Sequence, residues 1–183
     1  MTNQRVTVHP YTSDLGSMQD IQIGTAVLAY DCPLTYQTYI LFFPQSLHIP
    51  GMERHLICPA QLRTNNVGIN EVPLVHTPQN KRCRLTHSIW TNHPDPQLHI
   101  PLEMDGVTSF FNVRRPTRAE VNDDRNAIHV YMTSDTPWDP HSQQLGEEEA
   151  QLRTQFTDCP HQVRGHKLSR CNTTALDVDS HAD

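Results

Sequence analysis

The chain has 183 residues, 36 % of them hydrophobic, and a net charge of −6 with its histidines neutral. This length suits one domain with a tail, and the negative charge excludes a global basic surface for nucleic acid. No apolar run approaches the roughly 20 residues of a membrane helix, and no secretory signal opens the chain. We therefore expect an intracellular, cytoplasmic protein with no membrane partner. Its five irregularly spaced cysteines are expected to be reduced thiols.

Fourteen prolines spread along the chain favour short strands and turns over long helices. Alternation of apolar residues predicts a brief strand at 6–8 and a longer one at 21–30, which Gly24 interrupts either as a bulge or as a point of close approach. Residues 36–43 are apolar on both alternating faces, so we expect a central strand that is covered on both sides and closed by Pro44. The long strand and the central strand are predicted to form a hairpin.

A short strand at 47–49 and a Pro50-Gly51 turn are expected next. Residues 55–63 then take a helical apolar period, with Pro59 near the first turn, where its missing N–H matters least. Clean alternation predicts another strand at 67–72. The positions expected in the core are Tyr39 to Phe43, Leu56, Ile69, Ile100 and Phe111.

The strongest hairpin signal lies in the second half of the chain. Residues 98–104 and 107–113 both alternate, and Asp105-Gly106 between them predicts a two-residue turn. It is preceded by a polar loop at 76–84 and a strand within 85–90. The hairpin adds to a mainly β pattern.

Thr117 stands three residues before Glu120, which is the capping-box pattern of a short helix. A short strand is expected at 128–132, and a solvated helix at 143–156, which is rich in Glu, Gln and Leu. Because composition shifts at His141, we place a boundary there, with a β core and linker at 1–140 and a mostly disordered or helical tail at 141–183.

Several of these segments resemble copia-type retrotransposon Gag-Pol polyproteins, in their protease region and the linker after it. The resemblance covers about residues 5–142. It is carried by Ile23-Gly24-Thr25-Ala26-Val27, Leu47-His48-Ile49-Pro50, Met52, His55-Leu56-Ile57-Cys58, Gln61-Leu62, Ile100-Pro101-Leu102, Asp105-Gly106-Val107, Phe110-Phe111, Arg115-Pro116-Thr117 and Trp138-Asp139-Pro140. It implies a small retropepsin-like β-barrel or sheet core with one or two short helices and an irregular C-terminal tail.

Retropepsin-like proteases use one aspartate from each of two subunits, and the two carboxylates share a proton. Asp14, Asp20 and Asp31 lack the Ser/Thr-Gly that shapes such a loop. The segment Asp179-Ser180-His181-Ala182-Asp183 resembles the catalytic loop of the same branch of elements. The resemblance makes Asp179 the catalytic aspartate and Ser180 its supporting hydroxyl, whereas the alternative is an inert, frayed C-terminus.

The spacing of His161, His166 and Cys171 matches the last three ligands of a retroviral zinc knuckle. Zinc takes four ligands, so Cys159 or Asp158 would supply the fourth. Chance spacing in a histidine-rich tail is the alternative. Basic residues that a knuckle uses to grip nucleic acid are present as Arg164, Lys167 and Arg170.

Two function hypotheses follow. The first is a rearranged or truncated fragment of a retrotransposon polyprotein, related to its aspartic protease region and without peptidase activity as an isolated chain. The alternative is a small β-barrel interaction module with a zinc- or nucleic-acid-binding tail. A third, in which Cys58 is a nucleophile beside a histidine, carries little weight because we expect Cys58 to be buried. These hypotheses allow three partners: a second copy of the chain, a polypeptide substrate if the chain is active, and nucleic acid bound weakly through the tail.

Overall fold

The computed structural model describes residues 4–9, 16–52, 54–91, 98–122, 127–139 and 141–157, without the side chains of 155–157. Contacts group the chain into two units, Met1–Trp138 and Asp139–Asp183. The strands of the first unit are β1 (Arg5–Val8), β2 (Met18–Asp31), β3 (Thr38–His48), β4 (Val67–Asn70), β5 (Ser88–Thr91), β6 (His99–Pro101), β7 (Glu103–Asp105), β8 (Thr108–Phe110) and β9 (Ile128–Tyr131). The expected mainly β fold is confirmed.

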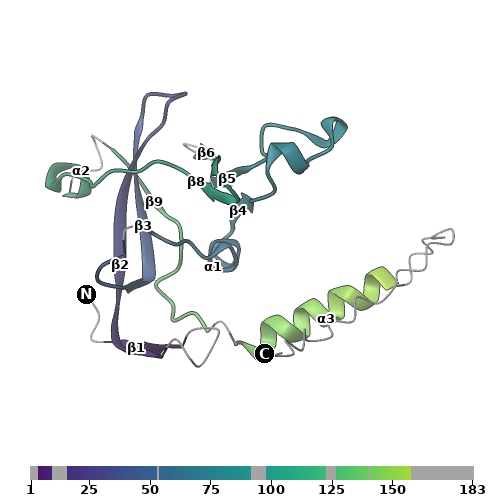
Figure 1. Cartoon of the computed structure of the whole chain (residues 1–183), viewed down its shortest axis with the longest axis horizontal. Coiled ribbons are helices and arrows are strands. Elements are labelled where there is room, and N and C mark those ends of the chain that lie inside the picture. Colours follow the sequence, from purple (N-terminus) through teal and green to yellow (C-terminus); the bar gives the residue numbers. More distant parts are fainter. Residues whose placement is uncertain are drawn as a thin grey trace, which may run out of the picture. The chain divides into compact units, whose positions relative to one another are not determined.

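Short helical segments connect these strands (Figure 1). They are α1 (Pro59–Thr64), the 3₁₀ turns η2 (Leu74–His76) and η3 (Gln79–Lys81), and α2 (Arg118–Asn122). The second unit contains α3 (Gln143–Thr157), at the place where the sequence predicts a solvated helix. No helix of the described residues is long and apolar enough to span a membrane.

A curled four-stranded sheet has the order β1-β2-β3-β9, with β2 and β3 as a long antiparallel hairpin. Strand β3 lies between β2 and β9, and Ile40 and Leu41 on its two faces are both fully buried. The central-strand prediction is therefore confirmed for 39–43, where alternate faces meet different cores. It is wrong for Tyr36, which lies in the hairpin turn at φ +57° and is 92 % exposed.

Strand β3 does not end at Pro44, as the sequence predicts, but runs to His48 through a bulge. The register with β2 shifts between Gly24 and Ala26, as predicted, and Gln45 takes a φ of +58°. Parallel pairing between β3 and β9 ends at Phe42. Beyond that residue β3 is an edge strand on the β9 side, and a proline is tolerated there because no N–H is needed for a neighbouring strand. The separate strand expected at 47–49 is the end of β3.

A second sheet has the order β4-β5-β6, and β7-β8 forms a separate two-stranded hairpin. The predicted hairpin is thus divided at Leu102, because β6 pairs with β5 and only β7 continues to β8. Its turn comprises Gly106 and Val107, one residue later than expected, with Gly106 at φ +60°. That positive φ suits glycine, and it follows Asp105 directly.

Of the remaining core positions, Ile100 is fully buried, and Ile69 and Phe111 are half-buried against the main cluster. Leu56 is a wrong prediction, because it is 78 % exposed in an extended segment before α1. The helix begins only at Pro59, so Leu56 never takes the helical position that would bury it.

Candidate functional site

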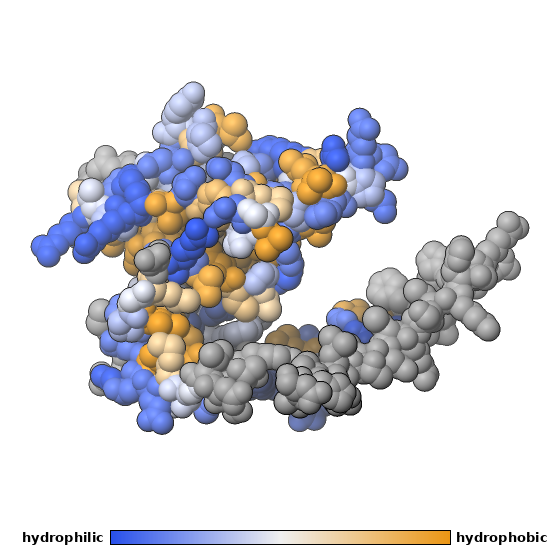
Figure 2. Space-filling view, in the orientation of Figure 1, coloured by the Kyte–Doolittle hydropathy of each residue, from blue (hydrophilic) through white to orange (hydrophobic). Residues whose placement is uncertain are grey.

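A groove of about 1250 Å³ lies between the β2 strand and the second sheet. It is bounded by β2, by the segment 54–59, by β4 and β5, and by the β7–β8 hairpin. Its apolar lining includes Leu28, Leu56, Ile69, Ile89, Leu102 and Phe111. In Figure 2, hydrophobic side chains gather on the viewed face between the β2–β3 hairpin and the second sheet, with hydrophilic residues around them.

The outer edge of β2 beside this groove is open over Gly24 to Leu28. On this outer side, backbone pairing with β1 and the residue before it extends as far as Ile23, whose N–H donates to the Gln4 carbonyl. Among the described residues, the next backbone pairing on this side is at Ala29. There Ala29 and Arg114 exchange two backbone hydrogen bonds of 2.9 Å. Alternation along a strand makes the N–H and C=O of Val27 point to the same outer side.

The crossing segment pairs with this edge at one position among the described residues, the isolated Ala29–Arg114 bridge. Two residues further along the segment is Pro116, which has no N–H to donate to a carbonyl of β2. On this outer side, no described residue forms a backbone hydrogen bond with the N–H or the C=O of Val27, which lines the groove.

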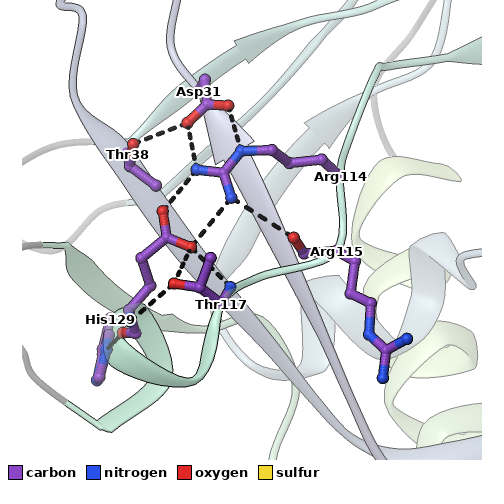
Figure 3. Close-up of polar contacts among 7 residues, drawn as sticks. Asp31, Thr38, Arg114, Arg115, Thr117 and His129 are labelled. Carbon is purple, nitrogen blue, oxygen red and sulfur yellow. Dashed lines mark hydrogen bonds and ion pairs between the residues drawn. The ribbon is translucent and has the colours of Figure 1, made fainter.

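Arg114 is the centre of a charged network at one end of the groove (Figure 3). Its guanidinium donates to Asp31 at 2.7 and 3.0 Å and to Glu120 at 2.6 and 3.0 Å. Thr117 completes the predicted capping box, with its N–H 2.8 Å from Glu120 Oε2 and its hydroxyl accepting from the Glu120 N–H at 3.3 Å. Two bidentate contacts fix the plane of the guanidinium, so the network clamps the 114–120 segment onto β2.

These contacts shift the ionisation of all three groups. Hydrogen bonds from Arg114, then from Thr117, lower the pKa of Glu120 to about 2, and hydrogen bonds from Arg114 and Thr38 lower the pKa of Asp31. The two carboxylates in turn raise the pKa of Arg114. The neighbouring Arg115 also lines the groove, and its guanidinium points away from the network (Figure 3).

The two carboxylates that line the groove itself are also ion-paired. Asp105 Oδ2 lies 3.2 Å from an Arg54 nitrogen, and Glu71 Oε2 lies 2.6 Å from Arg63. Burial raises the pKa of Glu71, but the Arg63 hydrogen bond and charge bring it below its ordinary value. The Glu71 carboxylate therefore stays ionised near neutral pH.

A histidine and a serine meet at the wall of the groove. His87 Nε2 lies 2.9 Å from Ser109 Oγ, and Ser109 lines the groove while His87 is 5 % exposed. Burial lowers the pKa of His87, so the ring is neutral near pH 7. His87 also has a φ of +53°, an uncommon conformation for a histidine.

The site residues named from the sequence lie outside the described residues. These are Asp179 and Ser180 for catalysis and Cys159, His161, His166 and Cys171, with Asp158 as an alternative, for zinc. Within the described ranges no group of three or more His, Cys, Asp or Glu side chains is placed to hold a metal ion. Asp20 pairs with Arg5, and Asp31 with Arg114.

Cys58 is exposed, which corrects the expectation that it is buried. It caps α1 through its backbone, and its side chain makes no capping hydrogen bond. The sequence reasoning also missed the Asp31–Arg114 contact and the His87–Ser109 pair. Both join residues more than 20 positions apart, and only the capping-box spacing of Thr117 and Glu120 was visible along the chain.

Comparison of the chain with protein-family models, with curated proteins and with solved structures found no match.

Proposed function

We propose that this chain is a polypeptide-binding β module, related to the protease region of copia-type retrotransposon polyproteins and without aspartic peptidase activity of its own. Its occupant is an extended peptide that adds to the open edge of β2 and places alternate side chains into the groove. We place the protein in the cytoplasm, and the free thiols of Cys32, Cys58 and Cys83 agree with a reducing compartment.

The observation that carries this proposal is the open β2 edge inside an apolar groove. A groove of about 1250 Å³ is larger than the roughly 300–1000 Å³ of typical small-molecule pockets. Its apolar lining supplies burial for side chains, while Val27 supplies an unpaired N–H and C=O for main-chain recognition. Exposed strand edges beside apolar pockets are the usual sites of β-strand addition.

The charges around the groove support binding rather than aspartic proteolysis. Asp105 and Glu71 each have an arginine, and not a second carboxylate, as their ion-pair partner. An aspartic site needs such a pair above the scissile bond. Asp179 lies outside the described residues, and a cleavage assay tests its role.

The binding test starts from a phage-displayed library of linear nonapeptides. An enriched peptide, labelled with a fluorophore, is titrated with the full chain and with Leu56→Arg. Because Leu56 lines the groove and is largely exposed, this change fills the groove with little effect on folding. We expect affinity to fall at least about tenfold, equivalent to about 1.4 kcal/mol.

The matched control is Leu34→Arg, which also replaces an exposed leucine but lies in the β2–β3 turn outside the groove lining. It should bind like the unsubstituted chain. Failure to enrich any peptide, or equal binding by both arginine variants and the unsubstituted chain, would refute the groove as the binding site.

The peptidase part is tested separately with denatured casein between pH 3 and 7. We expect no cleavage that pepstatin inhibits. Cleavage that pepstatin blocks and Asp179→Asn abolishes would show that the chain retains an aspartic site. It would refute the claim that the chain has no aspartic peptidase activity.

A further inference from the structure

We propose that Ser109 and His87 form a nucleophile–base pair that hydrolyses uncharged carboxylic esters with an apolar acyl group. This activity goes beyond the binding function and does not depend on it. The pair stands at the wall of the groove, where Ser109 is accessible and His87 is shielded. A nucleophile and a base within hydrogen-bond reach are the first requirement of this chemistry.

The geometry gives His87 the role of the base. At 2.9 Å, Ser109 Oγ donates its hydrogen bond to Nε2 when the ring carries its proton on Nδ1. Because burial lowers the pKa of His87, the ring is unprotonated at neutral pH and its Nε2 lone pair is free to accept. The backbone carbonyl of His87 is held by the Leu102 N–H at 2.9 Å, which fixes the residue against β6–β7.

The register of the β7–β8 hairpin supplies an oxyanion donor. A two-residue turn makes Asp105 and Thr108 the hydrogen-bonded closing pair, so Met104 and Ser109 form a non-hydrogen-bonded pair. The N–H of Ser109 therefore points away from β7, and no described residue outside the hairpin accepts it. The nucleophile's own N–H is then available to the oxygen that becomes negative in the transition state.

The reaction balances with water as the second reactant. Ser109 Oγ attacks the ester carbonyl carbon while its proton moves to His87 Nε2. The bond from that carbon to the alcohol oxygen breaks, and the alcohol leaves with the proton from His87. Water then attacks the acyl-serine by the same route, which releases the carboxylic acid and restores the Ser109 hydroxyl. The groove's apolar lining beside Ser109 favours an uncharged, apolar acyl group.

The first test treats the full chain with an alkyl fluorophosphonate and maps the adduct by mass spectrometry, alongside p-nitrophenyl butyrate hydrolysis. We expect one adduct, on Ser109, and loss of both adduct and hydrolysis in Ser109→Ala. Ser46→Ala is the control, since Ser46 donates to the Phe43 carbonyl at 2.7 Å and makes no hydrogen bond to a histidine of the described residues. Absence of labelling, or labelling unaffected by Ser109→Ala, would overturn the proposal.

The role of the base is tested with His87→Gln, which should slow labelling about 100-fold. Because His87 is buried and this variant can fail to fold, Ser109→Cys provides a second measurement in the intact histidine background. Iodoacetamide should alkylate residue 109 at pH 7 about tenfold faster than residue 46 in Ser46→Cys, as read by peptide mapping. Equal alkylation rates would contradict activation by His87.

Discussion

Replacement of Gly68 by alanine should destabilise the second sheet because of a specific overlap. Gly68 in β4 pairs across the strands with Trp90 in β5, and the indole lies over the glycine. A Cβ at residue 68 would overlap three ring atoms of that indole. Trp90 must therefore leave its rotamer or β4 must move, and overpacking of this kind costs typically about 1–3 kcal/mol.

Thermal unfolding followed by circular dichroism measures this effect. A loss of about 1–3 kcal/mol corresponds to a fall of about 2–12 °C in the melting temperature of a domain this size. Tryptophan fluorescence should also shift as Trp90 is displaced. The matched control is Gly24→Ala in β2, where an added Cβ meets no atom within 4 Å, so stability should change by less than about 0.5 kcal/mol. Equal melting temperatures for both variants would refute the β4–β5 register.

Three further outcomes are expected. Ile40→Asp should abolish cooperative unfolding, because it places an unpaired carboxylate at a fully buried position and costs several kcal/mol; a folded variant would refute the central-strand assignment. Glu120 has a pKa of about 2 against an ordinary 4.5, so its stabilisation is complete above pH 4.5 and is lost as the pH falls toward 2. Urea unfolding should therefore find Arg114→Gln less stable than the unsubstituted chain at pH 6, with the difference narrowing toward pH 2, whereas a constant difference would contradict the network. If the segment at 158–171 binds zinc, cobalt(II) added to the full chain at neutral pH should give a tetrahedral visible band that Cys171→Ser and acid both remove, and absence of the band would end the zinc hypothesis.

Local patterns were sufficient to predict the β2–β3 hairpin, the β3 core and the capping box. Tyr39 to Phe43 carry a double-faced apolar pattern that only a central strand satisfies. Thr117 and Glu120 are three residues apart, so their reciprocal hydrogen bonds depend on chain geometry alone. These features need no knowledge of distant contacts.

The sequence-based predictions were wrong where contacts between distant residues decide the conformation. Pro44 is accommodated within β3 because β9 stops pairing two residues earlier and the Thr133 hydroxyl donates to the Pro44 carbonyl at 2.7 Å. Leu102 interrupts the predicted hairpin because its N–H is taken by the His87 carbonyl. The open edge of β2 could not be predicted from the sequence either, since it depends on a crossing segment that pairs with β2 only at Ala29 among the described residues.

Hydrogen exchange at the Val27 amide tests the central claim most directly. The full chain is measured free and saturated with an enriched nonapeptide, and again with the same peptide N-methylated along its backbone. If the peptide adds to β2, the Val27 amide should exchange at least about tenfold more slowly in the complex, and the methylated peptide should not bind. Unchanged exchange at Val27 in the saturated complex, or equal affinity of the methylated peptide, would contradict strand addition at this edge.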